Sequence, residues 1–461
     1  MSAHTAAAGP RPSPAAPREY RFPVFERHTL ENGLRIIVAP VAKLPLVTVF
    51  ALVEAGAAVE PPAQAGVAAL SVRLLLEGAA GMNGAELSER FERIGASVDA
   101  HADWDVASLS LTTLSERLPE ALALVGDLLR APDFPEREIE RLREERLAEL
   151  LQQRTEPRGL ADEQFAQALY EPSARYARPQ DGDAASVRAI TGEQVRAFYS
   201  ARYQPPGVTL IFAGDVTMAR ALELTRTLFG NWTGTPVAPP ASAVDATLPG
   251  RSLRIVAKED APQSEVRVGH LGASRTTLDY FDVVVMNAVL GGLFSSRINL
   301  NLREAHGYTY GAHSEFDWRL GTGPFLVSTA VKSEVTGDAV REILGEIERI
   351  RSTPIAEDEL TLATSFLDGV FPIRYETTAA IASALANLVI HRLPDRYYDD
   401  YRARVRAVTV EGVLRAAQAH LHPESLRVVV VGDPAAIAGS VSDAVGFAAT
   451  VVSLEGRELN A

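Results

Sequence analysis

The sequence predicts an α+β fold made of two homologous repeats, each a largely antiparallel sheet with helices packed on one face. Two observations predict it. The chain of 461 residues repeats a pattern of strands and amphipathic helix at a nearly constant spacing, and a Pro-rich stretch separates the copies. Short β-branched runs such as LRIIVAP do not alternate strictly with helices, which argues against a doubly wound sheet. We therefore expect two halves that face each other like a clam.

The clearest repeat lies near the end of each half, in residues 190–215 and 408–433. Each copy predicts a helix that begins after a Thr N-cap and ends before a Pro, followed by a β-branched strand closed by Gly-Asp. The copies are 218 residues apart, so Thr191 corresponds to Thr409. This agreement in order and spacing indicates one structural unit used twice.

A second repeat lies earlier in each half. RIGASVDAHADWD and AHGYTYGAHSEFD align at a spacing of 212 residues, which places His101 on His313. The spacing returns to 218 after an insertion near residues 319–323. Each block predicts two strands and then an amphipathic helix. The repeated histidine suggests a packing role shared by both halves.

The repeats define the expected domains. We expect a disordered Ala- and Pro-rich tail over residues 1–19, an N-terminal domain over 20–235, a linker over 236–250 and a C-terminal domain over 251–461. The tail has no apolar core, so it does not form a signal peptide as it stands. This predicts a cytoplasmic protein by default, and a periplasmic one if a leader has been removed.

Composition excludes several classes of function. A net charge of −14 argues against a nucleic-acid partner and against anionic membranes. We find no apolar run that approaches the ~18 residues needed to span a bilayer. The absence of cysteine excludes disulfides, thiolate metal sites and a cysteine nucleophile. The phosphate-binding, dinucleotide-binding and G-x-S-x-G motifs are also missing.

Two segments carry the candidate chemistry. The first, VEAGAAVEPPAQAGVAALSVRLLLEGAA, predicts a strand, a loop and a helix. The second, which begins at Gly291 with GGLFSSRINLNLREAHGYTY, predicts a glycine turn and a helix that ends near Arg303, with Tyr310 seven residues later. Taken singly, Arg303 could be a surface charge on a helix and Tyr310 a strand aromatic packed on the sheet.

Both segments resemble the insulinase-like family, which includes pitrilysin and the mitochondrial processing peptidase, and the resemblance covers nearly the whole chain beyond the tail. These inverted zinc peptidases carry H-x-x-E-H on a helix. By this resemblance, the first His, the catalytic Glu and the second His fall on Ala69, Val72 and Arg73, and the third ligand falls on Glu149. An acidic residue seven positions earlier is replaced by Leu142.

These replacements imply that the chain holds no metal of its own. Zinc needs three or four His, Cys, Asp or Glu ligands, and one carboxylate does not suffice. The general base that would activate water is missing too. We expect Arg73 and Glu149 to form an ion pair that closes the vacated site, as suits the geometry of a guanidinium group.

In the two-subunit branch of the family, one chain supplies zinc and the other an Arg/Tyr pair. The resemblance implies that Arg303 and Tyr310 are the catalytic residues of this chain, which forms half of a chamber around a peptide. The residues that it implies for substrate binding are Gly291, Gly292, Phe294, Ser295 and Ser296. The implied partner is a homologous subunit with intact H-x-x-E-H and its zinc ion. The alternatives are an inert scaffold subunit and a peptide-binding homodimer.

Weaker candidates remain open. The stretch near Val98 resembles the family's substrate-facing edge strand, where zinc-bearing members have Asn near the position of Asp99; it could equally be an ordinary edge strand protected by charges. His420 and His422 could bind a metal, but they precede Pro423. A C-terminal histidine that complements the helix dipole is therefore favoured.

Overall fold

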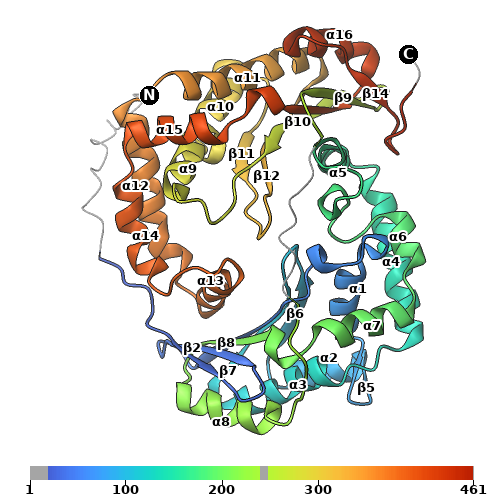
Figure 1. Cartoon of the computed structure of the whole chain (residues 1–461), viewed down its shortest axis with the longest axis vertical. Helices are drawn as coiled ribbons and strands as arrows, with labels where there is room; N and C mark the ends of the chain where they lie inside the picture. Colours follow the sequence, from blue (N-terminus) through green and yellow to red (C-terminus); the bar gives the residue numbers. More distant parts are fainter. Residues whose placement is uncertain (1–18, 239–247, 460–461) are drawn as a thin grey trace, which may run out of the picture.

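The computed structural model describes residues 19–238 and 248–459. Most of the predicted tail and of the predicted linker lies outside the described residues. The described chain forms two halves, each built on a six-stranded sheet, which face each other across the molecule (Figure 1). The predicted fold class is therefore confirmed.

The sheet of the N-terminal half has the strand order β1-β2-β8-β3-β7-β6, and only β2 and β8 pair in parallel. Its strands are β1 (Glu26–Thr29), β2 (Arg35–Pro40), β3 (Leu46–Val53), β6 (Ser97–Ala102), β7 (Ala107–Leu114) and β8 (Val208–Gly214), and a separate ribbon pairs β4 (Gly78–Ala79) with β5 (Met82–Asn83). The helices are α1 (Val67–Leu74), α2 (Gly84–Arg93), α3 (Leu118–Arg130), α4 (Glu136–Gln153), α5 (Pro157–Leu169), α6 (Ala184–Ala189), α7 (Gly192–Arg202) and α8 (Met218–Phe229).

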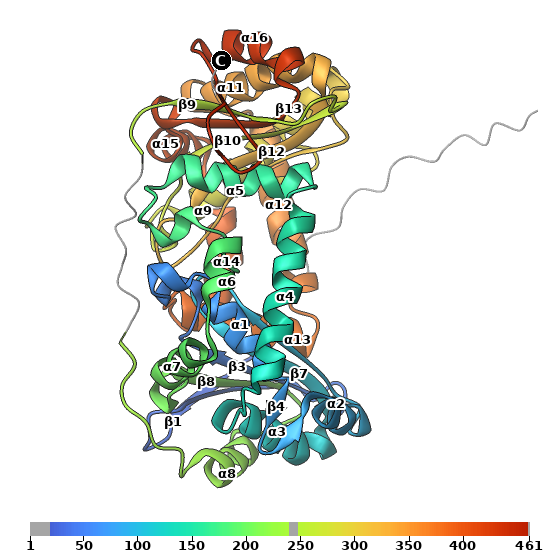
Figure 2. The ribbon, with the colours of Figure 1, turned by 90° about the vertical axis from the view of Figure 1, so that its right-hand side faces the viewer.

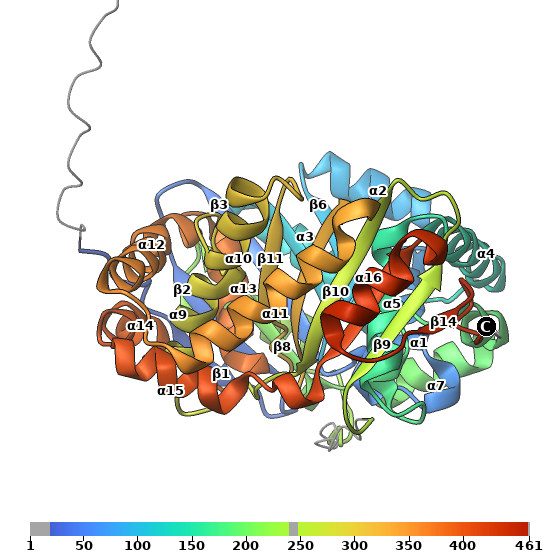
Figure 3. The ribbon, with the colours of Figure 1, turned by 90° about the horizontal axis from the view of Figure 1, so that it is seen from above.

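The sheet of the C-terminal half has the order β11-β12-β10-β13-β9-β14. Its strands are β9 (Ser252–Ala257), β10 (Gln263–Leu271), β11 (Ala312–Phe316), β12 (Pro324–Lys332), β13 (Arg427–Gly432) and β14 (Thr450–Val452). The helices are α9 (Tyr280–Asn287), α10 (Arg297–Asn299), α11 (Thr336–Ser352), α12 (Glu357–Arg374), α13 (Thr378–Ile390), α14 (Tyr397–Arg406), α15 (Val410–His420) and α16 (Pro434–Val445), with π-helical turns η6 (Ala288–Gly292) and η7 (Leu300–Ala305) beside α10. Helices α11 and α16 pack together over the outer face of this sheet (Figure 3).

The repeated helix and strand form as predicted. The Thr191 hydroxyl caps α7 by accepting a hydrogen bond from the backbone of Gln194, and Thr409 caps α15 in the same way. Strands β8 and β13 follow these helices and are buried along their whole length. A strand buried on both faces needs a continuous run of apolar residues, which explains the VTLIFAG and RVVVVG sequences.

The inner face of each sheet is covered by a helix from the other half. Helix α5 crosses to the C-terminal sheet and packs on β10 and β13, while α13 crosses to the N-terminal sheet and packs on β3 and β8 (Figures 1 and 2). Phe165 of α5 joins the apolar cluster of Val429, and Leu385 of α13 joins that of Ile211. The exchange therefore gives each half a part of its core.

The strand register corrects one alignment. The pairing of β11 with β12 is shifted by two residues relative to that of β6 with β7, so His313 corresponds to Asp99 rather than to His101. Both histidines are exposed, and each lines a cavity. The predicted packing role of these histidines is therefore wrong, because alternate residues of these edge strands point away from the helices.

The stretch Tyr280–Ala305 has the length and mean hydropathy (1.4) of a membrane-crossing helix, although the sequence suggested no such run. In the structure 56% of its apolar window is buried inside the protein. Leu293 and Ser296 adopt extended backbone conformations that interrupt the helix. The stretch is therefore a core element of the C-terminal half, and it packs beside β11.

Candidate functional site

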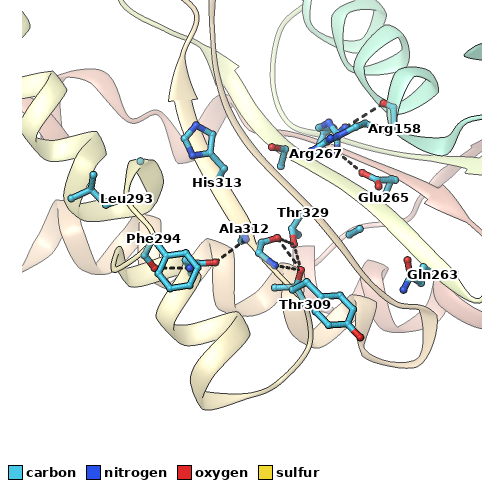
Figure 4. A pocket seen from close by; sticks show the side chains of 16 residues that line it. Arg158, Gln263, Glu265, Arg267, Leu293, Phe294, Thr309, Ala312, His313 and Thr329 are labelled. Atoms are coloured by element: carbon cyan, nitrogen blue, oxygen red, sulfur yellow. Dashed lines mark hydrogen bonds and ion pairs between the residues drawn. The ribbon is translucent and has the colours of Figure 1, made fainter. Parts of the chain in front are cut away.

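A cavity of about 460 Å³ lies on the inner face of the C-terminal sheet. Its wall comes from β10, β11 and β12, the turn before β11, the loop after η6, and Arg158 of α5 (Figure 4). Three of the predicted site residues line it, namely Gly292, Phe294 and Tyr310. We call this cavity the Tyr310 cavity.

Tyr310 projects its ring into solvent from a fixed turn. The residue is 95% exposed, and its hydroxyl makes no hydrogen bond to any described residue. The turn itself is held by two threonines: Thr309 Oγ1 and Thr329 Oγ1 donate to the Gly311 carbonyl at 2.9 and 3.0 Å. This exposure is inconsistent with the alternative interpretation, in which Tyr310 is a strand aromatic that packs on the sheet.

Asn299 connects the parts of the site, and the sequence analysis missed it. Its Nδ2 donates to the Phe294 carbonyl at 2.5 Å, and its Oδ1 accepts from the backbone N–H of Ala312 at 3.0 Å (Figure 4). Asn299 is 2% exposed. An amide flanked by Ile298 and Leu300 is the signal that could have identified it, because a polar group that is buried among apolar residues needs hydrogen-bond partners.

Arg303 lies beside the cavity and does not line it. Its guanidinium group stacks on the Phe294 ring, 4.2 Å from the ring centroid. Its Nη1 atom is buried and has no hydrogen-bond acceptor in the described part of the chain, where a carboxylate oxygen of Glu304 lies 3.5 Å away. The structure thus packs Arg303 against Phe294, a residue that lines the same cavity as Tyr310, and one guanidinium nitrogen has no acceptor among the described residues.

The remaining predicted substrate-binding residues occupy different environments. Gly291 is buried, and a Cβ there would lie 2.4 Å from Ser314 Oγ of β11, so the close contact between helix end and strand requires glycine. Ser296 is buried and its Oγ has no partner among the described residues. Ser295 is exposed and lies outside the Tyr310 cavity lining.

The floor of the Tyr310 cavity is charged. Arg267 is 1% exposed and donates to Asp162 at 2.6 Å and to Glu265 at 2.9 Å. Burial alone would lower the pKa of Arg267, but the hydrogen bonds and charges of these two carboxylates outweigh it and raise the pKa. The fully charged guanidinium therefore fastens α5 to β10 directly beneath the cavity.

The outer edge of β11 is already occupied. Asn287 Nδ2 donates to the Ser314 carbonyl at 2.9 Å, and Asn299 accepts from Ala312. A peptide would have to displace both amides to add to this sheet as a strand. Strand β6 is an edge strand of the N-terminal sheet and lies beside α1, a position that fits both a substrate-facing strand and an ordinary edge strand.

The predicted metal-helix positions lie together on α1 and α4. Ala69, Val72, Arg73, Leu142 and Glu149 line one small cavity of about 80 Å³. Arg73 donates to Glu145 at 2.6 Å and lies 3.5 Å from Glu149. The predicted ion pair is present, and the stronger contact is to Glu145, which the sequence analysis did not identify.

These residues do not fit a zinc ion. A guanidinium group lies where the resemblance places the second histidine, and the two other positions carry alkyl side chains. Within residues 19–238 and 248–459, no three His, Asp or Glu side chains gather closely enough to hold a metal. The carboxylates beside these positions, Glu145 and Glu149, are already bound to Arg73.

The weaker histidine candidates have structural partners. His420 ends α15, as the dipole interpretation predicted, and its Nε2 lies 2.7 Å from Asp279. The backbone N–H of His422 donates to Nε2 of His270, and burial lowers the pKa of His270 to about 4. His270 is therefore neutral at pH 7, and its Nε2 can accept the hydrogen bond from the His422 backbone.

Two models of one family match the chain. The model described as "Insulinase (Peptidase family M16)" matches residues 37–177, and the one described as "Peptidase M16 inactive domain" matches residues 189–367. A Mycobacterium tuberculosis protein named as an uncharacterized zinc protease is 26% identical over 426 residues, which cover 92% of this chain and 96% of the relative. The probable mitochondrial-processing peptidase subunit beta of Arabidopsis thaliana is 23% identical over 420 residues, which cover 88% of this chain and 77% of the relative.

Solved structures share the fold. A crystal structure described as the peptidase M16 inactive domain from Pseudomonas fluorescens has a TM-score of 0.82 and 26% identity, and covers 89% of this chain and 98% of that one. A Helicobacter pylori protease has a TM-score of 0.83 at 20% identity, covering 89% and 100%. With both halves of the fold and both family models accounted for, the chain belongs to the insulinase family of peptidases, family M16.

Proposed function

We propose that this chain is the zinc-free subunit of a heterodimeric zinc endopeptidase. In this proposal a homologous partner with intact H-x-x-E-H carries the metal, and this chain contributes Tyr310, Arg303 and half of the chamber wall. The observation that carries the proposal is a contrast between the two halves. The metal positions are filled by an Arg–Glu ion pair, whereas Tyr310 is held on an ordered turn with an unused hydroxyl.

Tyr310 suits the stabilisation of a developing oxyanion. When water attacks a peptide bond, negative charge accumulates on the carbonyl oxygen, and a preorganised donor lowers the barrier. The Tyr310 hydroxyl is such a donor, and the threonine-held turn limits the reorganisation needed. An exposed position is required because the reacting bond would lie on the partner's side of the chamber.

Arg303 supplies a second donor set. Its side chain is 32% exposed, so a peptide carbonyl or the same oxyanion could accept a hydrogen bond from the exposed part of this side chain. Stacking on Phe294 restricts the guanidinium without neutralising its charge. The substrates that this arrangement favours are unfolded peptides, because both side chains would donate to backbone oxygens, which every peptide carries.

The test is cleavage of an unfolded peptide by the complex of this chain with an H-x-x-E-H partner. Tyr310→Phe removes only the hydroxyl, and we expect kcat to fall by about 10²-fold, as for the loss of one oxyanion donor. Arg303→Ala should lower kcat/KM by a comparable factor.

The matched control is Tyr308→Phe, which changes a neighbouring tyrosine that stacks on His306 and lies outside the Tyr310 cavity lining. This variant should cleave at the unmodified rate. If the Tyr310→Phe complex also keeps its full rate, the catalytic role is excluded, and an inert scaffold or a peptide-binding homodimer becomes the better account.

A further inference from the structure

A second large cavity lies in the C-terminal half, away from the Tyr310 cavity. It measures about 580 Å³ and is bordered by the end of β11, the loop before α9, the end of α12, α13 and α14. Its lining includes Arg275, Tyr280, Trp318, His391, Tyr397 and Tyr401. We call it the Arg275 cavity. Neither the family's metal site nor the Arg/Tyr pair involves these residues.

Arg275 is a buried cation without a carboxylate. It is 7% exposed, its guanidinium carbon lies 3.5 Å from the centroid of the Tyr280 ring, and its Nη2 donates to Tyr397 Oη at 2.7 Å. It forms no ion pair with any residue in the described part of the chain. Buried charges are normally paired, so a cation that faces an open cavity indicates a missing anionic ligand.

The surrounding groups select a small carboxylate. Burial raises the pKa of Tyr397 and Tyr401 and lowers that of His391 to about 4, so these side chains are neutral at pH 7. The two acids of the lining differ: Asp317 bonds to Arg319 at 2.8 Å, and the one ionic partner of Glu315 among the described residues is His313, at 3.9 Å. Because Arg374 also lines the cavity and offsets Glu315, Arg275 leaves about one positive charge to be matched, which a single carboxylate supplies and a phosphate exceeds.

The aromatic walls suit an apolar group attached to that carboxylate. Tyr280 packs against Trp318 with ring centroids 4.9 Å apart, and Tyr397 and Tyr401 lie 6.0 Å apart on α14. Aromatic side chains offer large apolar areas at little entropic cost. A carboxylate joined to an apolar or aromatic side chain would satisfy both parts of the cavity.

A third cavity borders both the Tyr310 cavity and the Arg275 cavity. A smaller cavity of about 220 Å³ shares Gly292 and Leu293 with the Tyr310 cavity, and it shares Tyr280 and Trp318 with the Arg275 cavity. His313 lines the Tyr310 cavity, and Asp317, four residues later, lines the Arg275 cavity. Four residues of extended chain span about 13 Å, so a short extended peptide can reach from one cavity to the other.

We propose that the Arg275 cavity is a subsite for a carboxylate of a bound peptide, supplied by its C-terminus or by an acidic side chain near its end. Arg275 binds the carboxylate, and the tyrosines hold the adjoining apolar group. This inference rests on the proposed function, because it takes the ligand to be the chamber's peptide. It adds an anchor several residues from the bond that is cut.

The test measures binding by the full chain alone, without turnover, at pH 7. Three versions of one fluorescent ten-residue peptide ending in Phe are compared: the free acid, the C-terminal amide, and the amide with Glu before the Phe. We expect the free acid or the Glu-bearing amide to bind about tenfold more tightly than the plain amide, as for a hydrogen-bonded charge. The peptide that binds more tightly shows whether Arg275 binds the C-terminal carboxylate or that of an acidic side chain.

The preference should disappear in Arg275→Gln and persist in Arg137→Gln, which removes the same charge from a 92% exposed position on α4. Equal binding of all three peptides by the unmodified chain would overturn the proposal, and so would a preference retained by folded Arg275→Gln. The peptide comparison on the unmodified chain decides the question if that variant does not fold. Because no cleavage is measured, this result is independent of the Tyr310→Phe test.

Discussion

Arg73 occupies the position where the resemblance places a zinc-binding histidine, and it pairs with Glu145 and Glu149. A charged pair between α1 and α4 keeps these helices together where family members with H-x-x-E-H would use a metal. Single side chains thus decide whether this half carries chemistry. The fold around them matches that of a solved family member with a TM-score of 0.82, so we expect substitution to reverse the change.

We predict that Ala69→His, Val72→Glu and Arg73→His together restore zinc binding. Residues 69 and 73 are four apart and share one face of α1, and Glu149 already reaches the side chain at position 73. The variant should bind about one zinc ion per chain by metal analysis after dialysis. Adding Glu149→Gln should remove most of that zinc; a folded triple variant that stays metal-free would show that α1 and α4 are not placed as a metal site.

At the scale of elements, the β6–β7 hairpin of the N-terminal half meets the loop after β11. Asp105 Oδ2 accepts from the backbone N–H of Leu320 at 2.9 Å, and Arg319 stacks on Trp104 at 4.4 Å. Asp105 is buried, and this burial raises its pKa to about 6. Its other oxygen, Oδ1, has no partner among the described residues.

This contact predicts a pH dependence of stability. The pKa of Asp105 is higher in the folded protein than the 3.8 of a free aspartate, so its stabilising contribution is complete below about pH 4 and is lost as the pH rises through about 6. Asp105→Asn keeps an acceptor for Leu320 and should stabilise the protein at pH 8 by about 1–3 kcal/mol. Near pH 4 the two proteins should unfold alike.

The measurement is the thermal unfolding midpoint at both pH values. Asp443→Asn, on the exposed surface of α16, is the matched control and should leave the midpoint unchanged at pH 8. A variant at position 105 that is destabilised equally at pH 8 and pH 4 would mean that the carboxylate is held ionised by its neighbours.

Local patterns predicted much of the element scale. The Thr caps of α7 and α15 and the β-branched strands β8 and β13 are specified by neighbouring residues, so the sequence was sufficient for them. The register of β11 was not, because strand pairing depends on residues distant in the chain. The Arg275 cavity was missed for the same reason: it unites side chains from residues 275–280, 315–318 and 374–401.

At the scale of the whole molecule, the exchange of α5 and α13 joins the two halves into one unit. Each helix completes the core of the opposite sheet, so separating the halves would expose apolar surface on both. The sequence predicted two repeats but not this exchange, since the amphipathic pattern of a helix does not show which sheet the helix packs on. The Tyr310 cavity, the smaller cavity and the Arg275 cavity follow one another along the inner wall so formed.

The central claim is that the metal and the phenol of one active site reside on different chains. The most direct measurement is peptide cleavage and zinc content for this chain alone, for an H-x-x-E-H partner alone, and for the two mixed. We predict that only the mixture cleaves efficiently, with one zinc per heterodimer, carried by the partner. Zinc-dependent cleavage by this chain alone, or a partner that gains nothing from its presence, would contradict the account.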